Sequence, residues 1–374
     1  MNANPRTDAM PRARQSVYLG AVVLALATGC AEPEGPCAGE GVICRLAGTG
    51  VRGFNGDGHP ADRTSFYLVS AVRRGPDGRI WIMDFNNHLL RQITDDGRVV
   101  TMVGSGMHDF ATVGGPALES ALENPIDFGF LPDGSTVLVA YHDSRILRVN
   151  ADGILESLAG ALEVGIEGDG GPASAARFVE LTAMVVGPDG SIIVSDDQAA
   201  RVRVLRPDGI VDRVAGTRQG YAGDGGPAVE ARFRRPTQMS LGADGSLFVA
   251  DTYNHVIRRI DPEGMIETVV GTGDAGFEGD DGPATSAQLR NPGGVAVDAD
   301  GTLYVADTRN HRIRQITPDG IITTIAGTGE AALAGDGGPA IDAALNEPSC
   351  ISLDGDSLLI ADYANHSARA LYLR

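Results

Sequence analysis

The sequence predicts an all-β fold, a six-bladed β-propeller with four strands in each blade. Two observations lead to this prediction: a repeat of nearly constant length fills most of the chain, and the chain ends are out of phase with it by one strand. A glycine that follows Ala or Val in a turn marks each copy, at Gly48, Gly104, Gly160, Gly216, Gly271 and Gly327. Successive glycines are 55 or 56 residues apart, and such a period indicates units that stack on one another.

The copy at 291–329 shows the unit most clearly. It contains four short runs rich in β-branched and aliphatic residues, at 294–298, 303–306, 312–316 and 321–326. Asp-Gly and Asn-His dipeptides separate these runs, and such residues favour tight turns. We therefore expect four antiparallel strands per unit, and six units closing into a ring.

The phase of the chain ends indicates how the ring closes. The chain stops after the third strand of the sixth unit, whereas residues 42–47 (VICRLA) match the fourth strand at 321–326 (IITTIA). We expect residues 42–47 to complete the last blade, so that the propeller spans residues 42–374.

Residues 1–29 are interpreted as a lipoprotein signal peptide. Three arginines precede an apolar run at 17–27, which is too short to span a bilayer. Cys30 follows small residues, which resembles the bacterial lipobox, although Ala27 stands where Leu is usual. That resemblance implies a lipidated Cys30 as the first mature residue. The alternatives are an ordinary signal peptide and a short membrane anchor left in place.

Residues 30–41 then form the lipidated cysteine and its tether. Ala31 after Cys30 favours, by resemblance to enteric lipoproteins, the outer membrane. We therefore expect a monomer in the cell envelope, in the outer membrane or at the cell surface, held only by its lipid anchor. An exported chain can hold a disulfide, and Cys37–Cys44 is the first choice. Cys37–Cys350 is the alternative, and a free, buried Cys350 is favoured.

The turn between the second and third strands resembles a known repeat. Asp-x-x-Asn-His-x-Ile/Leu-Arg occurs at 84–91, 251–258 and 307–314, and in part at 362–369. This pattern is similar to the NHL repeat, and the added Gly-Asp-Gly-Gly-Pro-Ala element resembles the long blades of bacterial secreted proteins and of the teneurin NHL domain. The resemblance implies a six-bladed, TolB-like propeller over 42–374. NHL propellers serve protein binding, RNA binding and a few lyases, so the fold leaves the function open.

Five of the six long inserts carry an aspartate after a glycine, and these residues are Asp57, Asp169, Asp224, Asp280 and Asp336. A Pro-Ala-x-x-Ala pattern follows, which predicts one helical turn begun by Pro and pinned by a final apolar residue. We interpret the aspartates as caps of that turn. The alternative is a ring of carboxylates that binds Ca²⁺ or a basic partner, although no insert has the spacing of an EF-hand loop.

Four histidines recur at the blade period, at His88, His255, His311 and His366. Equivalent atoms of adjacent blades are too far apart to share one Zn²⁺. We therefore expect each histidine to lock its turn through a hydrogen bond to a neighbouring backbone group or Asp.

The inner strands offer no recognisable active site. One set of equivalent positions holds Ala71, Asp127, Ala183, Gln238, Gly294 and Cys350, so Asp127 is the only carboxylate in it. No nucleophile–base pair, Gly-x-Ser-x-Gly motif or nucleotide-binding motif is found. A net charge of −19 argues against nucleic acid. We expect no cofactor beyond the Ca²⁺ alternative.

Blade two departs most from the repeat. Its insert replaces Gly-Asp with Thr112-Val113, and its turn is one residue shorter. Drift of a redundant repeat explains this; the alternative is a ligand surface, formed by His108, Phe110, Asp127, Tyr141 and His142. The sequence thus favours a non-enzymatic, lipid-anchored scaffold that recognises a protein, glycan or other ligand on one propeller face. The alternative is a metal-dependent lyase or hydrolase with its site at the central channel.

Overall fold

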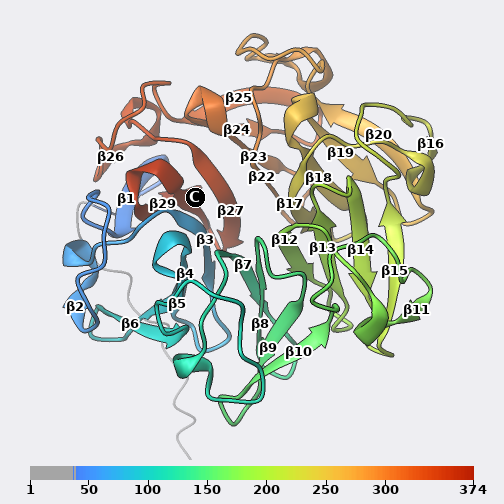
Figure 1. The fold of residues 1–374 in the computed structure, drawn as a ribbon. Helices are drawn as coiled ribbons and strands as arrows, with labels where there is room; N and C mark the ends of the chain where they lie inside the picture. Colours follow the sequence, from blue (N-terminus) through green and yellow to red (C-terminus); the bar gives the residue numbers. More distant parts are fainter. Residues whose placement is uncertain (1–36, 38) are drawn as a thin grey trace, which may run out of the picture. The chain divides into compact units, whose positions relative to one another are not determined.

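The computed structural model describes Cys37 and residues 39–374, which form a six-bladed β-propeller (Figure 1). The predicted signal peptide, Cys30 and most of the tether lie outside the described residues. Figure 1 looks nearly along the central channel, with the first strand of each blade beside it. The predicted fold class and the six blades are confirmed. No helix in the described part of the chain is long and apolar enough to cross a membrane.

Each blade is an antiparallel sheet whose strands follow one another outward from the channel. Blade one contains β3 (Val69–Arg74), β4 (Ile80–Asp84), β5 (Leu89–Ile93) and β6 (Arg98–Val103). Blade two contains β7 (Pro125–Phe130), β8 (Thr136–Ala140), β9 (Ile146–Val149) and β10 (Leu155–Ala159). Blade three contains β12 (Leu181–Val186), β13 (Ile192–Asp196), β14 (Arg201–Leu205) and β15 (Ile210–Ala215).

The other three blades follow the same order. Blade four contains β17 (Pro236–Leu241), β18 (Leu247–Asp251), β19 (Val256–Ile260) and β20 (Met265–Val270). Blade five contains β22 (Gly294–Val297), β23 (Leu303–Asp307), β24 (Arg312–Ile316) and β25 (Ile321–Ala326). Blade six contains β27 (Pro348–Asp354), β28 (Ser357–Asp362), β29 (Ser367–Tyr372) and, from the other end of the chain, β1 (Val42–Ala47).

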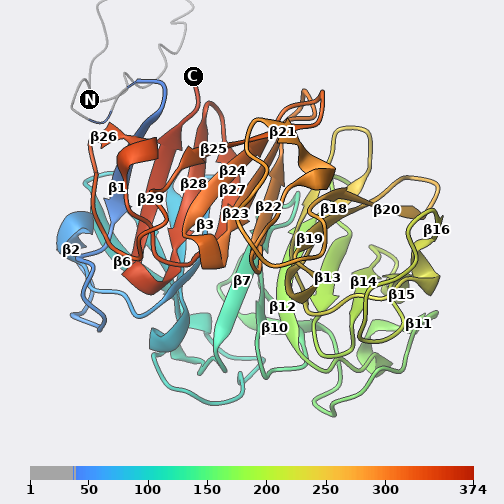
Figure 2. The ribbon, with the colours of Figure 1, turned by 90° about the horizontal axis from the view of Figure 1, so that it is seen from above.

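The two ends of the chain close the ring, as the phase of the repeat predicts. Strand β1 pairs antiparallel with β29, with Ile43 opposite Leu371, and both side chains are buried. Figures 1 and 2 both draw β1, in blue, beside β29, in red. A disulfide joins Cys37 to Cys44, with their Cα atoms 5.7 Å apart.

The inserts add a fifth strand to five of the six sheets, where the sequence predicts four. These edge strands are β2 (His59–Pro60), β11 (Gly171–Pro172), β16 (Gly226–Pro227), β21 (Gly282–Pro283) and β26 (Gly338–Pro339). Each has only two residues, too few for a strand pattern to emerge in the sequence. Blade two has no such strand and keeps four.

One turn of 3₁₀ helix follows the proline of each insert, as predicted. These turns are η1 (Ala61–Arg63), η3 (Ala117–Glu119), η4 (Ala173–Ala175), η5 (Ala228–Glu230), η7 (Ala284–Ser286) and η9 (Ala340–Asp342). The apolar residue that ends each insert, for example Phe66 or Leu345, is fully buried. The turns between second and third strands carry η2 (Phe85–Asn87), η6 (Thr252–Asn254), η8 (Thr308–Asn310) and η10 (Tyr363–Asn365).

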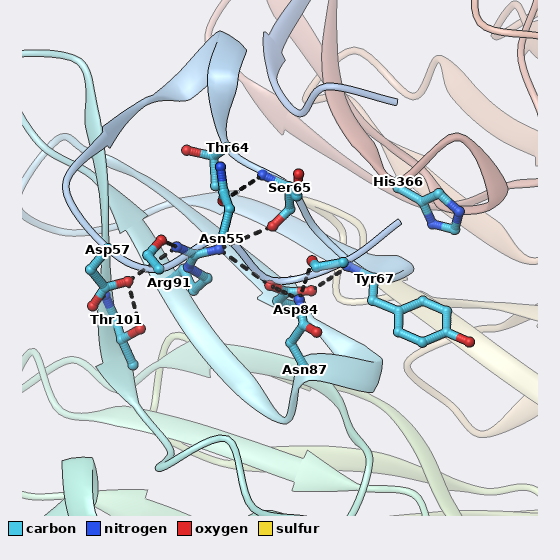
Figure 3. Close-up of polar contacts among 12 residues, drawn as sticks. Asn55, Asp57, Thr64, Ser65, Tyr67, Asp84, Asn87, Arg91, Thr101 and His366 are labelled. Carbon is cyan, nitrogen blue, oxygen red and sulfur yellow. Dashed lines mark hydrogen bonds and ion pairs between the residues drawn. The ribbon is translucent and has the colours of Figure 1, made fainter. Parts of the chain in front are cut away.

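A buried arginine holds each regular insert against its blade. In blade one the guanidinium of Arg91 is fully buried and lies 3.4 Å from Asp84 of the turn and 3.1 Å from Asp57 of the insert (Figure 3). It also donates to the carbonyl oxygen of Gly56. Burial is the largest influence on Asp84 and raises its pKa to about 6, although the hydrogen-bond donors and Arg91 around it act in the opposite direction. Because this pKa lies below 7, the carboxylate is ionised at neutral pH.

Three other blades repeat this arrangement, with Arg258, Arg314 and Arg369 as the buried cations. In blade three the buried Arg203 pairs with Asp169 of the insert and donates to the carbonyl oxygens of Arg177 and Glu167. The interpretation of the insert aspartates as helix caps is therefore wrong. No side chain caps the 3₁₀ turns, and the carboxylates point instead to the arginine. Asp57 also accepts a hydrogen bond from the backbone N–H of Thr101 in the fourth strand.

Blade two replaces all three members of this network together. The positions of Asp57, Asp84 and Arg91 are occupied there by Val113, Ala140 and Leu147. Because Ile82 pairs with Arg91 and Leu138 with Leu147, the turn has the same length in both blades, and the prediction of a shorter turn in blade two is wrong. Its turn is held instead by Arg145, which donates two hydrogen bonds to Asp143 and one to the carbonyl oxygen of Ala111. Because a lone buried charge is costly, the three residues are expected to change as a set.

The blade-period histidines connect neighbouring blades. The Nδ1 atoms of His255, His311 and His366 accept hydrogen bonds from the backbone N–H groups of Asn291, Glu347 and Leu68, each at 3.1 Å. The expected hydrogen bond thus occurs for three of the four. In His88 the buried Nδ1 atom has no partner among the described residues, and the ring stacks on His108, with 4.5 Å between centroids.

We predict that Arg314→Leu lowers the free energy of unfolding by about 3–5 kcal/mol, because Asp307 and Asp280 lose their counter-ion. The triple variant Asp280→Val, Asp307→Ala, Arg314→Leu copies blade two and should recover at least half of that loss. Urea unfolding followed by circular dichroism measures both. A triple variant less stable than the single one would contradict this account.

We predict that His311→Asn lowers the free energy of unfolding by about 1 kcal/mol at pH 7.5, because an inter-blade hydrogen bond is lost. Burial lowers the pKa of His311 below its ordinary value of 6.5, so the unfolded chain takes up the proton first as the pH falls. The stabilisation is complete above about pH 6.5 and is lost below it, so the difference between variant and wild type should shrink by pH 5. His88→Asn, which removes no such bond, is the matched control; equal costs for the two variants would refute the assignment.

Candidate functional site at the mouth of the channel

A cavity of about 410 Å³ opens at the end of the channel where the first strands of the blades begin. Six equivalent positions, one per blade, line it: Ser70, Ile126, Thr182, Thr237, Gly293 and Ser349. We call this cavity the cup. Residues of the turns after the second strands surround these positions, among them Tyr141, Asp197, Tyr253 and Tyr363.

Hydroxyl groups of blades three to five tie the wall of the cup together. Thr182 donates to the carbonyl oxygen of Pro236 in the next blade, at 3.2 Å. Thr252 and Thr308 donate in the same way to the carbonyl oxygens of Pro292 and Pro348, at 2.8 and 2.7 Å. These hydroxyls are therefore committed to holding the blades in register.

Arg235 joins three blades at the rim of the cup. It extends from the start of blade four and lies 2.7 Å from Asp197 of blade three. It also donates to the hydroxyl oxygen of Tyr141 in blade two, at 2.7 Å, and lies 3.3 Å from Glu180. A bond between blades two and four is possible only because side chains at the mouth reach across blade three.

This network shifts the pKa values of its members. Its hydrogen bond to Asp197 raises the pKa of the Arg235 guanidinium, so this group stays charged. Burial raises the pKa of Tyr141 to about 12, aided by Glu180, so the phenol stays protonated at neutral pH. Two carboxylates, those of Asp197 and Glu180, share this one guanidinium, which leaves the network with one excess negative charge.

Side chains crossing the channel form the floor of the cup. The amide of Gln238 in blade four donates to the carbonyl oxygen of Ile351 in blade six, at 2.6 Å, and to the sulfur of Cys350, at 3.2 Å. On the other side Arg73 lies 2.7 Å from Asp127. Burial raises the pKa of the Cys350 thiol to about 12, and this cysteine is in no disulfide within the described residues.

The structure divides the five residues predicted as a ligand surface into two groups. Asp127 and Tyr141 line the cup. His108 and His142 lie outside its lining, and both contact one carboxylate oxygen of Glu123, at 2.8 and 3.0 Å. Phe110 is half exposed on the insert. The two groups meet where the Tyr141 ring packs edge-on against His142, with 4.8 Å between the ring centroids.

The insert aspartates do not gather around a common point. Each is paired with the arginine of its own blade. Within Cys37 and residues 39–374, no three His, Cys, Asp or Glu side chains are grouped as a metal site would require.

Sequence reasoning missed most of the cup, including Arg235, Asp197, Glu180 and the hydroxyl positions. Four members of the inner-strand set, Asp127, Ala183, Gln238 and Cys350, do line the cavity, together with the residues one position earlier in each strand. A pattern was nevertheless present: blades two and three lack the Asn-His turn of the other four blades, and the residues that follow their second strands, Tyr141 and Asp197, are the ones that contact Arg235.

Fold and repeat together define the class of this protein, a closed six-bladed propeller with a polar cup at one end of its channel. The family model described as the teneurin NHL domain matches residues 207–278 and 272–334. Protein SUPPRESSOR OF QUENCHING 1 of Arabidopsis thaliana is 28% identical over 289 residues, covering 73% of this chain and 27% of that protein. NHL repeat-containing protein 2 of Bos taurus is 35% identical over 158 residues, covering 38% and 22% of the two chains. The chain is thus similar to NHL-repeat β-propeller proteins, most directly over residues 207–334.

Solved structures share the fold at low sequence identity. An auxiliary nutrient binding protein from Bacteroides thetaiotaomicron has a TM-score of 0.64 and 16% identity, covering 88% of this chain and 75% of that one. A putative gluconolactonase has a TM-score of 0.54 and 15% identity, covering 88% and 91%. The chain spans only about a quarter of the length of the two curated relatives, so their activities do not transfer with the fold.

We predict that the Cys350 thiol of a chain starting at Ala31 does not react with Ellman's reagent at pH 8 while the protein is folded. The reason is its burial and raised pKa. Unfolding without reductant should expose one thiol, and reduction should expose three, because Cys37 and Cys44 are joined. Rapid reaction of the native protein would show that the floor of the cup is open.

Proposed function

We propose that this protein is a non-enzymatic binding protein that holds a compact ligand in the cup. The observation that carries the proposal is the convergence of blades two, three and four on Arg235. Tyr141 and Asp197, which come from the two turns that lack the Asn-His pattern, are bonded to this guanidinium. Such departures from a local rule are expected where function selects them.

The chemistry of the cup favours binding over catalysis. Its volume lies within the usual range of ligand pockets. Asp127 is bonded to Arg73, and Asp197 to Arg235, so neither carboxylate is free to act as a base. At the level of the fold, the likeness to a nutrient binding protein supports the binding proposal. The likeness to a putative gluconolactonase supports the alternative, a metal-dependent lyase or hydrolase.

We also propose that Cys30 carries the lipid anchor and that the tether at 30–41 holds the propeller at the cell envelope. The support is the signal-like segment at 1–29 and the disulfide between Cys37 and Cys44, which suits an oxidising compartment. Metabolic labelling with a palmitate analogue tests it: wild type should be labelled, and Cys30→Ala should not.

We predict that a library of small metabolites contains compounds that raise the melting temperature of the purified propeller. A ligand at one hundred times its dissociation constant stabilises by about 2.7 kcal/mol. Ser70→Leu fills the cup without removing a protein hydrogen bond and should abolish the shift. Phe110→Ala, on the insert outside the cup, is the control and should leave it unchanged.

Two results would contradict the proposal. If Ser70→Leu folds normally and the compounds still stabilise it, the cup is not their site. If the purified protein keeps stoichiometric Zn²⁺ or Ca²⁺ after dialysis and turns over a bound compound, the lyase or hydrolase alternative replaces the binding protein.

A further inference from the structure

Three exposed arginines stand together at the rim of the cup, in blades four and five. Arg309 belongs to the lining of the cup, and 56% of its side chain is exposed. The carbonyl oxygens of Arg234 and Arg290 accept the backbone N–H groups of the lining residues Tyr253 and Arg309, at 2.9 and 3.0 Å. Arg234 and Arg290 therefore begin directly beside the cup, and both side chains are exposed.

The fold does not require an arginine at the position of Arg234 and Arg290. The repeat uses only the backbone there, because the N–H groups of these two residues donate to the turn carboxylates of Asp251 and Asp307, at 2.7 and 2.8 Å. The same position in the other blades holds Tyr67, Glu123, Val179 and Asn346. Two adjacent arginine side chains at this position are thus available for a role other than folding.

The three guanidinium groups surround two of the blade-period histidines. Burial is the main cause that lowers the pKa of His255, and the charges of Arg234 and Arg290 lower it further. Burial is also the main cause for His311, whose pKa Arg309 and Arg290 lower further. Because Arg290 acts on both rings, it lies between them, and the cationic groups form one continuous row along the rim.

Hydrogen-bond donors in this row have no acceptor within the described part of the chain. Arg234 and Arg290 form no ion pair there, although the whole chain has 49 acidic and only 30 basic residues. Arg309 uses Nη1 to bond Glu347, which leaves its Nε and Nη2 groups uncommitted. The Nδ1 atom of His311 accepts a backbone N–H, so the neutral ring carries its proton on Nε2 and offers one more donor.

The balance of charge at this part of the rim suits a ligand with a single negative charge. Two carboxylates accompany the three arginines: Glu347, which is bonded to Arg309, and Asp274, whose charge acts on His255. Three positive charges against two negative ones leave one positive charge. The excess negative charge of the Arg235 network belongs to blades two and three, so the two sides of the cup differ in sign.

A carboxylate is the anion that this arrangement fits best. Guanidinium groups bind carboxylates through two parallel hydrogen bonds. A phosphate with two negative charges would exceed the single positive charge of the rim and would lie close to Glu347. The rings of Tyr253 and Tyr363 line the cup beside the arginines and offer apolar faces to the body of a ligand.

We propose that the cup binds a small organic carboxylate, whose carboxylate group is held at the rim by Arg290 and Arg309 while its body lies in the cavity. This inference rests on the proposed function and names its ligand class. Arg234 adds positive charge from blade four without being part of the cup lining. A cavity of about 410 Å³ is of a size for a compact ligand of this kind.

Isothermal titration with matched carboxylates and amides tests the proposal. The probes are butyrate, benzoate, phenylacetate and indole-3-acetate, the four corresponding amides, and phenyl phosphate. We expect at least one carboxylate to bind with one-to-one stoichiometry and its amide to bind at least tenfold more weakly, because the amide keeps the shape and loses the charge. Raising NaCl from 50 to 500 mM should weaken the carboxylate, since the arginines are exposed to solvent.

Variants of the two arginines separate a ligand contact from a structural role. Arg290→Gln and Arg309→Gln should each weaken carboxylate binding about tenfold, and Arg290→Lys should weaken it less. Because Arg290 has no ion pair within the described residues, Arg290→Gln should keep its melting temperature within about 2 °C of wild type. Arg63→Gln is the matched control: it also removes an exposed arginine without an ion pair, but outside the cup lining, so affinity should not change.

Several results would overturn the inference. They are the binding of no carboxylate, equal binding of a carboxylate and its amide, an affinity indifferent to both arginine variants, and tighter binding of phenyl phosphate. If the metabolite library instead yields a neutral or cationic compound whose effect Ser70→Leu abolishes, the proposed function stands and only the carboxylate assignment fails. If neither experiment finds a cup ligand, both fail.

Discussion

The structure depends on an arginine buried between two carboxylates. A guanidinium out of water is tolerated only when it is paired and its donors are satisfied, so Arg91 requires Asp84, Asp57 and the carbonyl oxygens of the insert in fixed places. The arginine therefore organises three segments at once: the third strand, the turn before it and the long insert. Once the insert is fixed, its final apolar residue, such as Phe66, is placed in the core between blades.

Neighbouring blades are then joined by smaller contacts of the same period. The ring nitrogen of a histidine such as His311 accepts a backbone N–H of the next blade. Threonine hydroxyls such as that of Thr308 repeat the connection nearer the channel. Each contact is modest, but the ring closes only if all six blades meet, and β1 joins both ends of the chain in one sheet.

Blade two shows what happens when the buried pair is given up. Val113, Ala140 and Leu147 replace its three members, and the edge strand of the insert is lost with them. The turn of blade two still places Tyr141 at the mouth of the channel, where Arg235 of blade four meets it, just as the regular turn of blade six places Tyr363 there.

Much of the fold could be predicted from the sequence alone. The constant spacing of the turn glycines, together with the out-of-phase fragment at 42–47, determined the number of blades and the way the ring closes, because covalent spacing and turn chemistry are local properties. The role of the insert aspartates could not be read in this way, since Asp57 and Arg91 are 34 residues apart in the chain and a capping aspartate has the same local pattern. The cup was decided only by the tertiary structure: Arg235 and Tyr141 lie 94 residues apart, and no periodicity shows that side chains of blades two and four meet across blade three.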